Sequence, residues 1–182
     1  MTMMVDEARS AAKRRLAVWG GAAALMALPV IGMRASEQVA SDPGDFVFLA
    51  ILLAGVGLAL ELAARVSDRA AYLAGVGCAL AAAALSLWIN LAVGIIGSED
   101  NPANLIYAGV LGVAALGAMF ARFRPTAMAY AMIAAAIAQA AAFVVALAAG
   151  LGFTGPITVF FCALWLLAAG LFRRAARAEA RA

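Results

Sequence analysis

The stretch 91–112, LAVGIIGSEDNPANLIYAGVLG, decides the fold, because an apolar run breaks there at a short polar turn and then begins again. Pro102 stands at the start of the second run, where a proline suits the first turn of a helix and removes no useful donor. Asp100 or Asn101, just before it, is suited to accept the free backbone amides of that turn. The pattern therefore predicts two helices joined by a tight turn.

The apolar runs on either side of this turn are too hydrophobic for an ordinary soluble domain. Of the 182 residues, 67% are hydrophobic and 13% charged, and the mean hydropathy is +1.01. Crossing the hydrocarbon of a bilayer takes about 20 helical residues, whereas open strands leave amides unpaired in lipid. We therefore predict an all-α integral membrane protein, a single membrane domain over residues 1–182. Its six candidate spans are 16–33, 46–64, 70–97, 103–121, 127–151 and 157–172.

The basic residues fall on one side of this six-span arrangement. Twelve of the thirteen lie at helix ends or in loops on that side, and only Arg34 lies opposite. The opposite loops carry acids, among them Glu99 and Asp100. Because short cytoplasmic loops are rich in Lys and Arg, both termini are predicted to be cytoplasmic. The net charge of +3 then belongs to residues that face anionic lipid, so no nucleic-acid partner is expected.

The six spans group into three helical hairpins, each with a proline in its outer turn: Pro43, Pro102 and Pro156. This regularity is explained either by threefold duplication or by the common sequence preferences of membrane hairpins. We predict a compact bundle of six transmembrane helices, arranged as three hairpins.

The outer turn of the second hairpin is the first candidate interaction site. Glu99, Asp100, Asn101 and Asn104 offer oxygen atoms of the kind that hard cations accept. Helix capping, a partner-docking loop and a bound cation are the three interpretations. Capping accounts for Asn101 but not for the density of polar groups. We predict no metal and no cofactor.

Asn101, Pro102 and Ala103 form a triplet similar to the pore triplet of the aquaporins. That family has two such triplets, the second followed by an arginine, on half-membrane helices. This chain has one triplet, with Asn104 after it, and six spans leave no residues for half-helices. The resemblance therefore implies no water pore.

Four polar side chains inside the spans are the candidate intramembrane residues: Glu61, Ser86, Asn90 and Gln139. Glu61 lies near the end of its span with Arg65 at i+4, a spacing that favours an ion pair along the helix. Asn90 and Gln139 lie deep, so both should point into the bundle and hydrogen-bond across helices. Packing is one interpretation of these residues, and a polar translocation path is the other.

The sequence contains few of the residues and motifs that usually form catalytic sites. The chain has no histidine, and its two cysteines, Cys78 and Cys162, lie inside predicted spans, where cysteine behaves as a small apolar residue. None of the usual nucleophile, phosphate-binding or metalloprotease motifs occurs. We therefore expect no enzyme activity.

Segments 88–112, WINLAVGIIGSEDNPANLIYAGVLG, and 45–63, DFVFLAILLAGVGLALELA, resemble a family of small, uncharacterised bacterial multi-span membrane proteins. The resemblance implies location in the bacterial inner (cytoplasmic) membrane, but no activity, ligand or catalytic residue. From the residues we predict a non-enzymatic structural or accessory subunit, embedded in the lipid bilayer, that self-associates or joins a larger membrane complex. A small transporter or channel with a polar path near Asn90 and Gln139 is the alternative.

Overall fold

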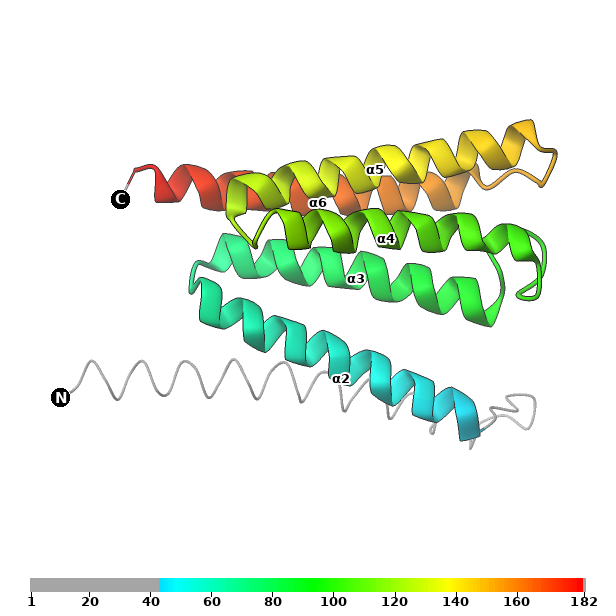
Figure 1. Ribbon diagram of the computed structural model, residues 1–182, viewed down its shortest axis with the longest axis horizontal. Coiled ribbons are helices and arrows are strands. Elements are labelled where there is room, and N and C mark those ends of the chain that lie inside the picture. The colour runs from blue at the N-terminus through cyan, green and yellow to red at the C-terminus, as the bar shows by residue number, and fades with distance from the viewer. Residues whose placement is uncertain (1–42, 182) are drawn as a thin grey trace. The chain divides into compact units, whose positions relative to one another are not determined.

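The computed structural model describes residues 43–181, and over this range the chain is helical with no strand. Its elements are α2 at Pro43–Val66, α3 at Ala70–Ala92, the 3-10 turn η1 at Pro102–Asn104, α4 at Leu105–Phe120, α5 at Pro125–Ala148 and α6 at Gly155–Glu179 (Figure 1). Five helices among these residues are long and apolar enough to cross a membrane. The all-helical prediction is confirmed for the described residues. The predicted span at 16–33 lies outside them.

The chain divides into two compact units, Met1–Arg65 and Val66–Ala182. In the first unit the described element is α2, a 24-residue helix that is apolar along most of its length. In the second unit, α3, α4, α5 and α6 run alternately up and down beside one another (Figure 1). All of the candidate site residues except Glu61 belong to this four-helix unit.

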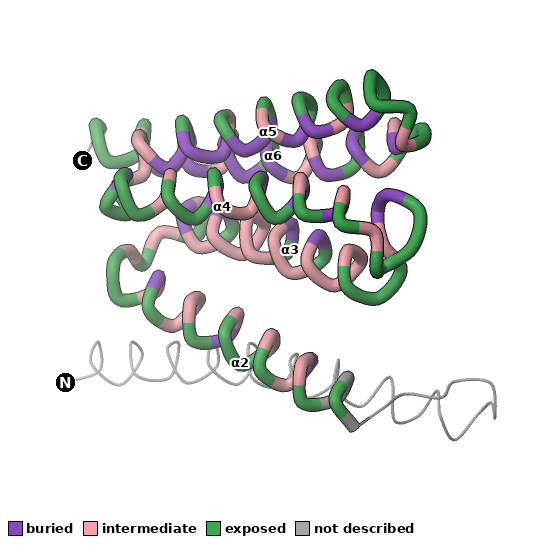
Figure 2. Tube along the Cα trace, turned by 45° about the vertical axis from the view of Figure 1, so that its right-hand side comes forward, coloured by how far each residue is buried: buried purple, intermediate pink, exposed green. Residues whose placement is uncertain are grey.

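The packing of the four helices follows their order in the chain except at α3, which packs mainly against α6. Helix α6 packs against α5 and α3, and α5 packs against α4, whereas α3 and α4 touch sparsely. Buried positions gather where α5 and α6 face each other (Figure 2). The predicted hairpin of α3 and α4 is therefore a short connection between helices that mainly pack against others.

The core combines small side chains on α5 with rings on α6. Ala135 and Ala146 of α5 are fully buried, as are Phe161 and Phe172 of α6. Small residues let helix backbones approach closely, which is the main source of packing energy between helices in lipid. At the α4–α5 contact, a Cβ built on Gly117 would lie 2.9 Å from the Cβ of Ala131, so only glycine fits there without movement.

Two helix ends differ from the sequence-based expectation. Helix α3 ends at Ala92 rather than at residue 97, because Gly94 adopts φ +77° and its N–H bonds back to the carbonyl of Ile89 at 3.0 Å. Helix α6 continues to Glu179 rather than stopping at 172. The residues past 172 are mostly Ala and Arg, which have high helix propensity, so the helix runs beyond the apolar segment.

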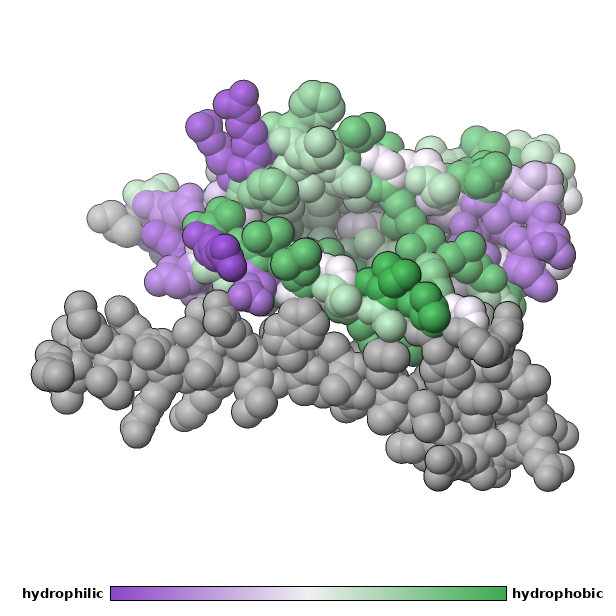
Figure 3. All heavy atoms as spheres, turned by 60° about the horizontal axis from the view of Figure 1, so that its bottom comes forward, coloured by the Kyte–Doolittle hydropathy of each residue, from purple (hydrophilic) through white to green (hydrophobic). Residues whose placement is uncertain are grey.

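The surface of the described helices is apolar in the middle and polar at the ends. On the face drawn in Figure 3, hydrophobic residues occupy the centre and hydrophilic residues gather toward both ends. Large apolar side chains such as Leu105, Phe120 and Ile137 are 65–85% exposed. An apolar belt of this kind is suited to lipid or to other membrane helices.

Candidate functional site

Asn104 holds the turn between α3 and α4 together. Its side chain is buried, and its Oδ1 accepts hydrogen bonds from the backbone N–H groups of Ile95, at 3.0 Å, and Ile96, at 2.8 Å. Its Nδ2 donates to the carbonyl of Ser98 at 2.7 Å. One amide therefore satisfies three backbone groups of a turn that has no regular structure of its own.

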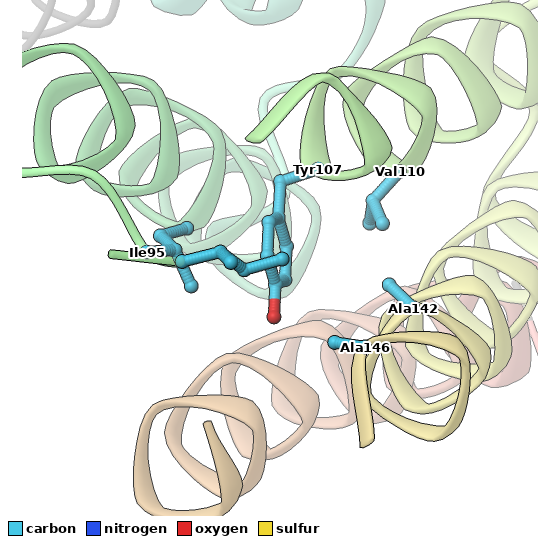
Figure 4. Close-up of a cluster of buried hydrophobic side chains, with 6 residues drawn as sticks. Ile95, Tyr107, Val110, Ala142 and Ala146 are labelled. Atoms are coloured by element: carbon cyan, nitrogen blue, oxygen red, sulfur yellow. The ribbon is translucent and has the colours of Figure 1, made fainter. Parts of the chain in front are cut away.

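The same turn carries an apolar cluster into the bundle. Tyr107 points from α4 into the space between Ile95 and the α5 residues Ala142 and Ala146 (Figure 4). Its hydroxyl lies 3.0 Å from Oγ1 of Thr154, just before α6, and makes a buried hydrogen bond. The turn is thus anchored to the adjoining ends of α4, α5 and α6.

Asn101 acts as the predicted helix cap. Its side-chain oxygen accepts a hydrogen bond from the N–H of Ala103 at 3.0 Å, with Pro102 in the first position of η1. Glu99 and Asp100 are exposed, and neither makes an ion pair or side-chain hydrogen bond with a described residue. In this turn the two asparagine amides therefore hydrogen-bond to the backbone, whereas the two carboxylates are exposed on the surface.

The described part of the chain contains no cluster of metal ligands. No group of three His, Cys, Asp or Glu side chains between residues 43 and 181 comes close enough to hold an ion. The amide oxygens of Asn101 and Asn104, which the cation interpretation would need, already accept hydrogen bonds from backbone N–H groups.

Glu61 and Arg65 form the predicted ion pair on α2. Nη2 of Arg65 lies 3.8 Å from Oε1 of Glu61, and the arginine side chain is 71% exposed. An exposed i,i+4 pair of this kind contributes roughly 0.3–0.5 kcal/mol. The pair accounts for the one acidic residue inside this span.

Ser86, Gln139 and Thr158 form a buried polar layer in the four-helix unit. They come from α3, α5 and α6, and their side chains are 1%, 0% and 5% exposed. Neither hydroxyl oxygen has a hydrogen-bond partner among the described residues, and neither do the two amide atoms of Gln139.

Contacts along the helices set the level of these residues. Cys78 Sγ on α3 donates to Leu164 O on α6 at 3.3 Å, and Cys162 Sγ donates to Ala136 O on α5 at 3.5 Å. Counting from these bonds along antiparallel helices at about 1.5 Å per residue puts Ser86, Thr158 and Gln139 within about 3 Å of one level.

Asn90 and Gln139, the two deep amides of the predicted spans, do not hydrogen-bond to each other. Asn90 lies one helical turn beyond Ser86, and its Nδ2 donates to the backbone carbonyl of Asn104 at 3.1 Å, toward the turn. Its Oδ1 has no partner among the described residues. Thr158, which the sequence analysis missed, takes part in the layer instead. A threonine two residues after Pro156 is the only signal that could have indicated it.

Helix α4 presents the most regular exposed face of the four-helix unit. Its exposed positions, together with the half-exposed Gly112, recur at helical spacing: Leu105, Ala108, Gly109, Gly112, Val113, Ala115, Leu116, Met119 and Phe120. Nothing lies within 4 Å of a Cβ built on Gly109 or Gly112. We call this set the α4 face. Ala108, Gly109 and Gly112 form a low centre of small residues in this face. Large side chains lie at its two ends, Leu105 at one and Met119 and Phe120 at the other.

Comparison with known proteins adds no assignment. No protein-family model, curated protein or solved structure matches the chain. The features that could support a function are the hydrogen-bonded turn between α3 and α4, the buried polar layer and the α4 face.

Proposed function

We propose that the protein is a non-enzymatic subunit of the membrane, structural or accessory, which associates with itself or with a larger membrane complex through the α4 face. The observation that carries this proposal is the open space above Gly109 and Gly112 on a helix whose other side is buried. In lipid, helices associate mainly where small residues let their backbones approach.

The shape of the α4 face supports a helix as the partner. Leu105 is 72% exposed at one end, and Met119 and Phe120 are 65% and 85% exposed at the other. Ala108 and Gly112 are four residues apart, the spacing of small residues in close helix pairs. A second helix lying over this centre would also contact the bulky side chains at both ends of the face. It would make more complete van der Waals contact with them than flexible lipid chains do.

Replacing both Gly109 and Gly112 with leucine should weaken association by roughly tenfold or more, because the two side chains fill the low centre of the α4 face. The measurement is the mass of the protein by light scattering in mild detergent over a range of concentrations, with identification of any co-purified chain. The matched control is G55L/G170L, since nothing lies within 4 Å of a Cβ at either position. A wild-type chain that stays monomeric and partner-free, or equal behaviour of both variants, would refute the proposal.

The topology belongs to the same proposal. We infer six spans in a bacterial inner membrane, with both termini on the cytoplasmic side. Arg65 and Arg69 flank the α2–α3 connection, and Arg122 and Arg124 lie between α4 and α5. Glu99 and Asp100 lie near the opposite end of α4. Basic residues are therefore found at one end of this helix and acidic residues at the other, as the sequence predicts.

Cysteine labelling tests this orientation. In a C78A/C162A background, Ser98→Cys should react with a membrane-impermeant maleimide on intact cells, whereas Asp68→Cys should react only after the membrane is opened. Ser98 and Asp68 are both exposed, in turns at opposite ends of α3, so they form a matched pair. The reverse labelling pattern would overturn the inferred topology.

A second candidate function, a small transporter or channel, is favoured by the buried polar layer. Gln139 offers two donors and an acceptor with no partner among the described residues, and the buried hydroxyls of Ser86 and Thr158 lie at a similar level along their helices. Groups of this kind suit water or a small uncharged polar solute, because donors and acceptors are mixed. Against this candidate, Gln139 is 0% exposed and Ser86 1%, so the layer is closed to the surface in this conformation.

A further inference from the structure

A basic groove lies where α5 begins and α6 ends. The cavity has a volume of about 380 Å³, and we define the basic groove by the polar residues that line it: Thr126 and Tyr130 of α5, and Arg173 and Arg177 of α6. It exists because α6 continues past residue 172, which carries both arginines alongside the first turns of α5.

The two arginines of the groove have no acidic partner among the described residues. Arg173 and Arg177 are exposed and one helical turn apart, and neither forms an ion pair or side-chain hydrogen bond among residues 43–181. Like charges at i,i+4 repel each other on a helix. An anion between two guanidinium groups would replace this repulsion with charge-assisted hydrogen bonds, for which the planar guanidinium suits phosphate oxygens.

The start of α5 adds further donors. A second cavity, of about 600 Å³, shares Thr126 and Tyr130 with the groove and is also lined by Arg124, Ala127 and Glu179. The residue before the helix, Arg124, makes no side-chain capping bond, and helix geometry leaves the N–H groups of Thr126 and Ala127 without an intrahelical acceptor. The positive end of the helix dipole therefore faces the same space.

The groove leads onto an apolar strip rather than into open water. Tyr130 and Ile137 of α5 are each 65% exposed, and Ala134 between them is exposed as well, so the three follow one side of the helix. An exposed tyrosine at the end of an apolar helix is typical of the membrane interface. A ligand with an anionic head and an apolar tail would contact both regions.

We propose that the basic groove binds the headgroup of an anionic phospholipid, with its phosphate between Arg173 and Arg177 and an acyl chain along Tyr130, Ala134 and Ile137. This is a defined site, beyond the general attraction of basic loops to an anionic leaflet. Glu179, on the rim of the second cavity, opposes the anion and limits its affinity.

Native mass spectrometry of the full chain in detergent tests the site, with phosphatidylglycerol and phosphatidylcholine of identical acyl chains as probes. Phosphatidylglycerol should bind at least tenfold more tightly. R173Q/R177Q should weaken its binding by roughly tenfold or more, because it removes the charge-assisted hydrogen bonds that the two guanidinium groups would donate to the phosphate. Glu179→Gln should strengthen it.

The control R65Q/R122Q removes the same charge from two exposed residues that line neither cavity, and should change binding less than threefold. Equal losses in both double variants would overturn the proposal, and so would equal binding of the two lipids. Displacement by millimolar inorganic phosphate would overturn the choice of a lipid. If R173Q/R177Q does not fold, Glu179→Gln alone tests the proposal. Removing this acid should strengthen phosphatidylglycerol binding at a defined site, whereas a diffuse attraction to the whole basic surface would barely change, and an unchanged affinity would overturn the proposal.

Discussion

Replacing Asn104 with alanine is expected to lower the free energy of unfolding by about 3–5 kcal/mol, because it leaves two buried backbone donors without an acceptor. These donors are the N–H groups of Ile95 and Ile96, which are 9% and 1% exposed. The change also frees the carbonyl of Ser98. Reversible unfolding in mixed micelles, followed by circular dichroism, measures the effect.

The matched control is Asn101→Ala in the same turn. Asn101 accepts a single bond, from the N–H of Ala103, so its loss should cost about 1 kcal/mol, as for other helix caps. Asn104→Asp keeps the acceptor but loses the donor to Ser98, so it should fall between the two. Equal effects of Asn101→Ala and Asn104→Ala would show that the turn does not depend on the buried amide.

Replacing Gln139 with leucine is expected to raise the free energy of unfolding by about 1–3 kcal/mol, because it removes a buried amide that has no partner among the described residues. Leucine is similar in size, so the packing of α5 against α6 should persist. The same unfolding assay measures the change. This outcome supports the subunit, in which the polar layer performs no transport.

The transporter candidate predicts the opposite result for Gln139→Leu. If the layer holds water or a polar solute, the variant loses those hydrogen bonds, its stability falls, and any solute flux into liposomes stops. The matched control is Ile137→Leu on the same helix, at a position 65% exposed, which should change neither quantity. A stability loss of about 1 kcal/mol or more together with lost flux would reject the subunit in favour of a transporter.

Local features of the candidate sites could be predicted from the sequence because they depend on near neighbours. The cap at Asn101 and the ion pair between Glu61 and Arg65 each involve residues at most four apart. The partner of Asn90 could not be predicted in this way. Asn90 bonds to the carbonyl of Asn104, and that geometry exists only once Gly94 has turned the chain back.

Asn104 shows how the interpretation of one motif changed. In the sequence it is one of four polar residues in an outer turn, equivalent to Glu99 as an interaction group. In the structure it is buried and serves three backbone groups, while Glu99 remains exposed. Only the path of the backbone shows that Asn104 stabilises the turn by hydrogen bonds, whereas Glu99 lies on its surface.

The all-helical class and the membrane-spanning length of the described helices could be predicted from the sequence. Long apolar segments in lipid must satisfy their backbone hydrogen bonds internally, which a helix does. Which helices pack together could be seen only in the folded structure. Every span is rich in Ala, Gly and Leu, so the sequence distinguishes their faces poorly. The close approach of Gly117 to Ala131 depends on how α4 packs against α5. The burial of Ser86, Gln139 and Thr158 depends in the same way on how their helices face the interior of the four-helix unit.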